Sequence, residues 1–186
     1  MKKKFSSVVL AMALLVACNN KTKNNTEQTS TDGVTNTGQE GVKDDESQKD
    51  IVKIAVGSKD HTTLVAALKQ AELVTSLSNA GPFTVFAPTN AAFDKLPAGT
   101  VEGLMKDEKK ADLQNILQYH VAVAVYKTDN MKDGQVIGMA NGDNITLRVK
   151  DGKVIVNGTA NIVASIPASN GIIHVVDAVL LPPGKN

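Results

Sequence analysis

The sequence is poor in the residues that most often carry chemistry. Among its 186 residues there are one cysteine, no tryptophan and three histidines, and aromatic residues make up 3%. A single cysteine excludes an internal disulfide and a cysteine-rich metal site. The histidines, His61, His120 and His174, form no His-x-x-x-His or Glu-x-x-His pair, so we expect no metal site and no cofactor.

A surplus of either charge is also missing. Lysine and arginine number 20 against 19 for aspartate and glutamate, a formal net charge of +1. This balance argues against a nucleic-acid partner. The chain also lacks a Gly-x-Ser-x-Gly elbow and a phosphate-binding glycine loop, so we assign no catalytic residue. A hydrolase that uses His120, Asp60 or His61 is the least favoured alternative.

The first residues, MKKKFSSVVLAMALLVAC, have the pattern of an export signal. Three lysines precede an apolar stretch, Phe5 to Ala17, that is too short to span a bilayer. The end of this stretch resembles the lipobox of bacterial lipoproteins. The resemblance implies that residues 1–17 are a signal peptide and that Cys18 is lipidated. The protein would then be exported and lipid-anchored to the bacterial cell envelope, on the outer membrane or the cell surface. An ordinary signal peptide with an incidental cysteine is the alternative.

Residues 19–50 contain asparagine, threonine, glutamine, glycine and charge, and almost nothing apolar. Such a segment cannot bury enough surface to offset its chain entropy. We therefore interpret residues 18–50 as a lipidated cysteine followed by a flexible polar tether. Residues 51–186 have a length that suits one domain with one core.

The domain changes its periodicity half-way. Apolar residues between Leu64 and Leu77 recur at helical spacing behind Thr62 or Thr63 as caps. Thr100 is expected to cap a short helix, and residues 107–120 indicate another. Strand patterns dominate the second half: residues 121–125, 144–149, 153–156 and 171–181, with a hairpin turn at Asp151-Gly152. The order predicts an α+β fold with its helices mainly in the first half.

The stretch GPFTVFAPTNAAFDKL, residues 81–96, connects a strand to a helix. Two phenylalanines anchor the strand, a proline interrupts it, a polar residue caps the helix, and a third phenylalanine fixes that helix to the core. We interpret this stretch as structural and not as the lip of an active site. The residues concerned are Phe83, Phe86, Pro88, Thr89 or Asn90, and Phe93.

Two long segments resemble the signatures of fasciclin-like domains. These are GPFTVFAPTNAAFDKLPAGTVEGLM and NGIIHVVDAVLLP, and Tyr119-His120 between them is similar to the family's Tyr-His segment. The resemblance covers residues 51–183. It implies a β-wedge of two packed sheets with several surrounding helices, and a binding or adhesion module without catalysis. The chain departs from the family at Ala122-Val123-Ala124-Val125, where many members carry a Pro-Gly turn.

The resemblance leaves two roles open for Tyr119 and His120. They are either hydrogen-bonded scaffold residues or a recognition surface, since animal members can bind integrins through this region. The chain has no Arg-Gly-Asp and no convincing acidic partner motif, so integrin binding is not carried over. His174 lies inside an apolar strand, with Ile172 and Val176 on its own face, and is expected to be a partly buried, hydrogen-bonded residue.

These features predict a membrane-anchored binding or adhesion module that is attached through the lipid on Cys18. Its partner would be a protein, a matrix component or a polysaccharide, and the domain itself is expected to be monomeric. The alternative is a structural or stress-related envelope lipoprotein that faces the periplasm.

Overall fold

The computed structural model describes residues 48–184. The predicted signal peptide, Cys18 and the tether as far as residue 47 lie outside the described residues. No helix within residues 48–184 has the length and apolar character that a membrane span requires.

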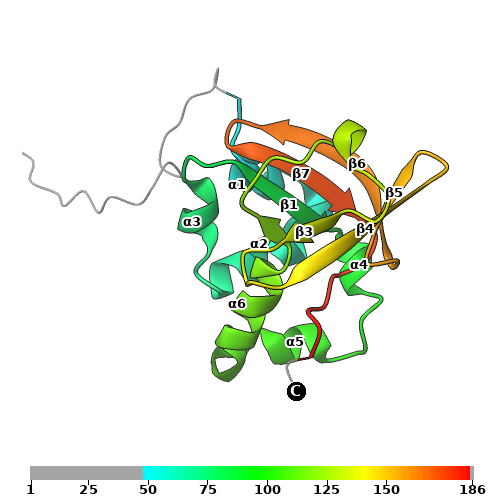
Figure 1. Cartoon of the computed structure of the whole chain (residues 1–186). Coiled ribbons are helices and arrows are strands. Elements are labelled where there is room, and N and C mark those ends of the chain that lie inside the picture. The colour runs from blue at the N-terminus through cyan, green and yellow to red at the C-terminus, as the bar shows by residue number, and fades with distance from the viewer. Residues whose placement is uncertain (1–47, 185–186) are drawn as a thin grey trace, which may run out of the picture. The chain divides into compact units, whose positions relative to one another are not determined.

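Helices dominate the first half of the domain and strands the second (Figure 1). The helices are α1 (Ile51–Val56), α2 (Thr62–Gln70), α3 (Val74–Ser78), α4 (Asn90–Phe93), α5 (Thr100–Leu104) and α6 (Lys110–Gln118), with 3-10 turns η2 (Lys59–His61), η3 (Asp107–Lys109) and η4 (Thr128–Asn130). The strands are β1 (Phe83–Pro88), β2 (Val121–Ala122), β3 (Val136–Gly138), β4 (Asn144–Lys150), β5 (Lys153–Val156), β6 (Ala160–Ala168) and β7 (Gly171–Val176). The α+β prediction is confirmed.

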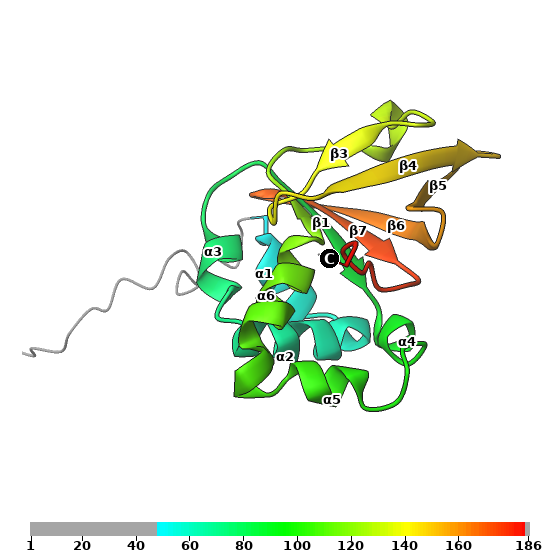
Figure 2. The ribbon, with the colours of Figure 1, turned by 60° about the horizontal axis from the view of Figure 1, so that its bottom comes forward.

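The strands form one continuous ladder in the order β2-β1-β7-β6-β5-β4-β3. The pair β1 and β7, second and third in this order, is parallel, and all other pairs are antiparallel. The ladder bends so that β3 and β4 lie across from β1, β7 and β6 (Figure 2). The amide of Ala140 donates to the carbonyl of Val121 at 2.7 Å, which joins the two ends of the ladder. The expected β-wedge is therefore a single, nearly closed seven-stranded sheet.

Strands β1 and β7 separate two apolar cores because their side chains alternate between faces. Ile173 and Val175 pack with helices α1, α2, α3 and α6 in the first core. Phe86 and Val176 lie in the second core, inside the wedge and against β3, β4 and β5. The alternation predicted for β7 is confirmed, with His174 on the wedge side.

The tight turns follow from local chemistry. Asp151 and Gly152 have φ values of 51° and 73°, and Asn157 and Gly158 have values of 51° and 70°. Asparagine, aspartate and glycine tolerate this left-handed region best, and two such residues in succession make the turn that fits the twist of a hairpin. The hairpin predicted at Asp151-Gly152 is confirmed, since it joins β4 to β5.

The helix expected from Leu64 to Leu77 is two helices, because the chain breaks at Glu72, where φ is 58°. The predicted caps at Thr62 and Thr63 are wrong. Thr62 is already inside α2, and the backbone amide of Thr63 donates instead to Oδ1 of Asn90, at 3.0 Å. Thr100 likewise lies within α5, whose cap position is Gly99.

Three further features differ from the prediction. Helix α1 was not predicted, and its cap is Asp50, whose Oδ1 accepts the amide of Lys53 at 2.7 Å. The carbonyl of Lys49 accepts the amide of Ser169 at 3.1 Å, so the last residues of the predicted tether belong to the fold. The strand expected over residues 121–125 ends at Ala122.

Candidate functional site

The phenylalanine-rich connection makes structural contacts. Phe86 is fully buried, and its ring lies 5.6 Å from that of His174. Thr89 caps α4 by accepting the amide of Ala92 at 3.3 Å. Asn90 reaches further: besides its bond to Thr63, it donates to the carbonyl of Lys59 at 3.0 Å. This connection ties α4 to the start of α2 and offers no free reactive group.

His174 is fully buried and hydrogen-bonded through both ring nitrogens. Its Nε2 lies 2.7 Å from the carbonyl oxygen of Tyr126, and its Nδ1 lies 2.8 Å from Oγ of Ser165. A carbonyl can only accept, so Nε2 carries the proton and Nδ1 accepts from the serine hydroxyl. Burial lowers the pKa of His174 below its ordinary value, and its bond to the Tyr126 backbone opposes this shift only in part.

Tyr119 is buried at the end of α6. Its hydroxyl donates to the carbonyl of Asn144 at 3.0 Å and accepts from Nδ2 of Asn157 at 2.9 Å. The amide oxygen of Asn157 in turn accepts the amide of Thr146 at 2.9 Å. The tyrosine thus connects the helical half to strand β4 and the turn after β5.

His120 is also buried, with 3% of its surface exposed. Its Nδ1 lies 2.8 Å from the carbonyl of Ile116, and its Nε2 accepts the amide of Leu180 at 3.0 Å. Nδ1 therefore carries the proton, and the ring is held neutral. Burial lowers the pKa of His120 to about 4, and its bond to Ile116 offsets that shift only in part. The geometry of Tyr119 and His120 fits the scaffold role better than a recognition surface.

The other candidate chemical groups do not converge. Nδ1 of His61 lies 2.8 Å from Oγ of Ser58, which also accepts the amide of Asp60 in the cap of η2. Burial lowers the pKa of His61, and the neighbouring charge of Asp60 opposes this shift. Within residues 48–184 no three histidine, aspartate, glutamate or cysteine side chains gather as metal ligands would.

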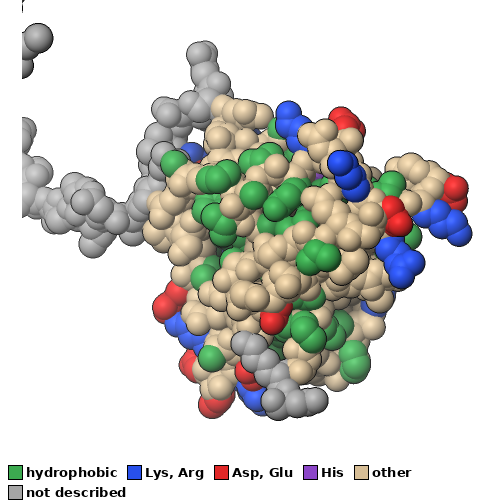
Figure 3. Space-filling view, viewed as in Figure 1, with side chains coloured by type: hydrophobic (Ala, Val, Ile, Leu, Met, Phe, Trp, Pro, Cys, Tyr) green, Lys and Arg blue, Asp and Glu red, His purple; other side chains and the backbone are tan. Residues whose placement is uncertain are grey.

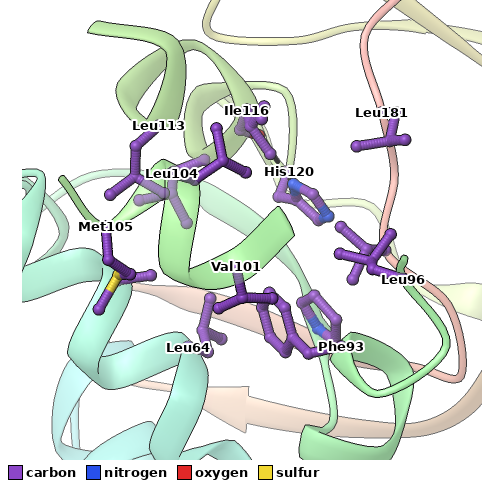
Figure 4. Close-up of a pocket in the computed structure, with 14 residues that line it drawn as sticks. Leu64, Phe93, Leu96, Val101, Leu104, Met105, Leu113, Ile116, His120 and Leu181 are labelled. Atoms are coloured by element: carbon purple, nitrogen blue, oxygen red, sulfur yellow. Dashed lines mark hydrogen bonds between the residues drawn. The ribbon is translucent and has the colours of Figure 1, made fainter. Parts of the chain in front are cut away.

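A narrow apolar pocket lies behind His120, between α6 and the segment that carries α4 and α5 (Figure 4). Its walls present no polar surface, although His120 is among them, because both ring nitrogens are already bonded to backbone groups. The space amounts to about 470 Å³ when its open mouth is included. The lining side chains are Leu64, Ala67, Pro88, Phe93, Leu96, Val101, Leu104, Met105, Leu113, Ile116, Leu117, His120, Val179 and Leu181.

A second surface feature is the segment that follows β2, residues 123–126, which we call the strap. Buried Thr84 holds it at two points: its hydroxyl donates to the carbonyl of Ala124 at 2.6 Å and accepts the amide of Tyr126 at 2.9 Å. His174 holds it at a third point through the Tyr126 carbonyl. Val123 and Val125 remain 63% and 45% exposed. Hydrophobic side chains gather on the molecular face that shows β1, β7 and β6 (Figure 3).

Comparison with known families identifies this architecture. The family model described as the Fasciclin domain matches residues 59–182. The chain belongs to the fasciclin family. Fasciclin domains are in general adhesion modules and not enzymes.

Fasciclin relatives occur in bacteria and animals. The chain is 51% identical over 138 residues to protein sll1483 of Synechocystis, which covers 74% of this chain and 76% of the relative. It is 36% identical over 129 residues to the cell surface glycolipoprotein MPB83 of Mycobacterium bovis, covering 67% of this chain and 56% of that protein. The match to the transforming growth factor-beta-induced protein ig-h3 of Sus scrofa is 35% identical over 135 residues, 73% of this chain and 20% of that protein.

The fasciclin fold is also confirmed by a solved structure, the domain pair of the insect cell adhesion molecule fasciclin I. The TM-score is 0.64 at 18% identity, and the match covers 72% of this chain and 51% of the pair. A likeness at this identity concerns the fold. It agrees with the nearly closed sheet and the helices of the first half.

Sequence reasoning did not find the pocket or the strap. The pocket is assembled from side chains of α2, α4, α5, α6 and the C-terminal segment, and no short motif encodes such a meeting. One feature of the sequence could have indicated the strap. The valines at 123 and 125 alternate with small residues as in a strand, although β2 ends at Ala122.

Proposed function

We propose that this chain is a binding module of the bacterial cell envelope, anchored through the lipid on Cys18, that adheres to a protein partner through the strap. Membership of the fasciclin family and the likeness to a cell surface glycolipoprotein support an exported adhesion module. The observation that carries the proposal is the exposure of Val123 and Val125 on a segment that three hydrogen bonds fix to buried side chains.

A fixed apolar surface is suited to recognition. Exposed aliphatic side chains favour burial against a partner, and a backbone already held in place loses little conformational entropy on binding. The strap is an irregular segment whose backbone donors and acceptors are partly bonded to Thr84 and His174, so the valines are presented in one arrangement.

The chemistry of the surface favours a protein over a polysaccharide. Sugar rings stack on aromatic faces, whereas the exposed large hydrophobic residues between 48 and 184 are all aliphatic: Val56, Val123, Val125, Val136, Val163, Ile166 and Leu181. Apolar side chains of a protein partner match such a surface better than hydroxyl-rich rings do.

Adhesion can be tested with beads that carry the purified chain and bind to intact cells of the producing organism. Replacing Val123 and Val125 by aspartate is expected to lower bead binding at least tenfold, because two charges would be desolvated in the contact. Val56→Asp is the matched control, since Val56 is 57% exposed at the end of α1. Equal binding by all variants, each with an unchanged melting temperature, would refute the strap as the adhesive surface.

The anchor and its orientation need a separate experiment. Protease treatment of intact cells that express the chain is expected to release the domain, and Cys18→Ala is expected to move it from the membrane fraction to the soluble fraction. Cleavage only after lysis would favour the alternative of a structural envelope lipoprotein that faces the periplasm.

A further inference from the structure

The pocket behind His120 has a cover that is held mainly by apolar contacts. We call residues 95–106, which include α5, the lid. The backbone hydrogen bonds of the lid are local: Thr100 donates to Pro97, Gly103 to Gly99, Met105 to Val101 and Lys106 to Gly103. Its side chains contribute one hydrogen bond, from Lys95 to the carbonyl of Asp177 directly after β7, at an exposed position. Leu96, Val101, Leu104 and Met105 line the pocket.

The lid also has the local structure of a segment that can shift. Helix α5 contains no buried residue and has no side-chain cap. Gly99, with a φ of 81°, is its cap residue, and Gly103 lies inside it, where glycine weakens a short helix. Opposite the lid, Leu113 and Leu117 of α6 and Leu64 of α2 are buried parts of the first core. One wall of the pocket therefore belongs to the buried core, whereas the lid rests on that core through the half-buried side chains of Leu104 and Met105.

The shape and chemistry of the pocket define what can enter it. In the arrangement shown in Figure 4 the space free for a water-sized sphere is only about 20 Å³, so any ligand larger than a water molecule requires the lid to move outward. The walls offer no hydrogen-bonding partner, so a polar group gains nothing inside and water is not stabilised there. Phe93 and Leu96 are half-buried and Leu181 is 54% exposed, which places the open mouth beside them.

We infer that the pocket binds the hydrocarbon chain of a free fatty acid. The hydrocarbon chain of the fatty acid enters between the lid and α6 and displaces the lid side chains outward. It then packs against Leu64, Leu113 and Ile116 in their place. The carboxylate stays in water at the mouth, because no polar group inside could replace its hydration. A two-chained phospholipid does not suit one narrow cavity. This site is separate from the strap and does not depend on its role in adhesion.

Binding can be measured by isothermal titration of the predicted mature chain, residues 18–186, carrying Cys18→Ala, which lacks both the apolar signal stretch and the predicted lipid attachment. Dodecanoate, kept below its micelle concentration, is expected to bind saturably with one molecule per chain. Octanoate and decanoate should bind more weakly, by about fourfold for each methylene that is lost, as burial of one methylene predicts. Dodecanoate should also raise the melting temperature.

Filling the pocket provides the decisive comparison. Val101→Phe adds volume at the lid and is expected to weaken dodecanoate binding at least tenfold, whereas Val163→Phe, at an exposed position of β6, should leave it unchanged. Hydrogen exchange on the unsubstituted protein should show that dodecanoate changes the protection of amides in residues 95–106 and in α6. This measurement tests the site without any variant and so remains decisive if Val101→Phe does not fold.

Three results would overturn the inference. They are the absence of saturable binding, an affinity that does not depend on chain length, and equal loss of affinity in both phenylalanine variants. Binding of the chain to phosphatidylcholine vesicles without binding of dodecanoate would also overturn it, since it would indicate adsorption to a lipid surface.

Discussion

The buried imidazole of His120 makes the domain sensitive to acid in a way that can be calculated. In the folded state its pKa is about 4, below the ordinary value of 6.5, because burial disfavours the charged ring. Between these two values the unfolded chain binds a proton that the folded chain does not. The stabilisation is therefore complete above pH 6.5 and is lost as the pH falls towards 4. From pH 7.5 to pH 5 the loss is about 2 kcal/mol, by the linkage relation.

Urea unfolding at a series of pH values between 5 and 8 measures this loss. His120→Gln is the comparison, because glutamine does not titrate and its side-chain oxygen can accept the Leu180 amide. His61 and His174 titrate in both proteins, and burial lowers the pKa of each, so the difference between the two slopes isolates His120. The glutamine variant is expected to lose about 2 kcal/mol less over this range. Parallel slopes in the two proteins would refute the buried, neutral state of His120.

Three substitutions test the packing. Phe86→Ala removes a fully buried ring beside His174 and should destabilise the domain by about 3–5 kcal/mol in urea unfolding, so a loss under about 1 kcal/mol would contradict its anchoring role. Tyr119→Phe leaves the carbonyl of Asn144 and the side-chain amide of Asn157 without the hydroxyl that bonds both, so the free energy of unfolding should fall by about 1–3 kcal/mol. An unchanged urea midpoint would show that water replaces the hydroxyl. Gly171→Ala places a methyl group onto the carbonyl of Phe83, its parallel partner, and should cost more than about 2 kcal/mol, so a calorimetric melting temperature equal to that of the unsubstituted chain would disprove the close approach.

Local chemistry predicted those parts of the fold that depend on neighbours in the chain. Asp151-Gly152 specified its hairpin because both residues tolerate positive φ, and alternation in β7 placed His174 and Val176 on one face. The sequence did not reveal the break at Glu72, because apolar residues keep helical spacing on both sides of it. Periodicity records which face is buried, and α2 and α3 both bury residues in the same core.

Long-range contacts decided the remainder. Asn90 caps a helix 27 residues earlier, whereas capping rules examine only the adjacent residues. Tyr119 and His120 were recognisable as a pair, but their burial follows from partners at positions 144, 157 and 180, which no local pattern identifies. The pocket escaped prediction for the same reason, since its walls come from five separate parts of the chain.

His120 lies beside the pocket and His174 holds the strap, and the two rings are opposite tautomers, protonated on Nδ1 and on Nε2 respectively. Acid should therefore affect the pocket and the strap differently. His120 accepts from Leu180, next to the pocket residues Val179 and Leu181, and a proton added to Nε2 would face the amide hydrogen and break that bond. His174 donates from Nε2 to the strap, and a proton added to its Nδ1 could still be accepted by the Ser165 oxygen.

When the C-terminal segment, residues 177–184, opens, His120 becomes free to take up a proton. The free energy of this opening should therefore fall by up to about 2 kcal/mol between pH 7.5 and pH 5. Hydrogen exchange, corrected for its intrinsic pH dependence, should then show protection at Leu180 falling by up to about 30-fold, because each 1.4 kcal/mol corresponds to a factor of ten. The amide of Tyr126, which donates to Thr84, should change much less. Equal loss at both amides would mean that the domain opens as one unit and that the assigned tautomers do not control its response to acid.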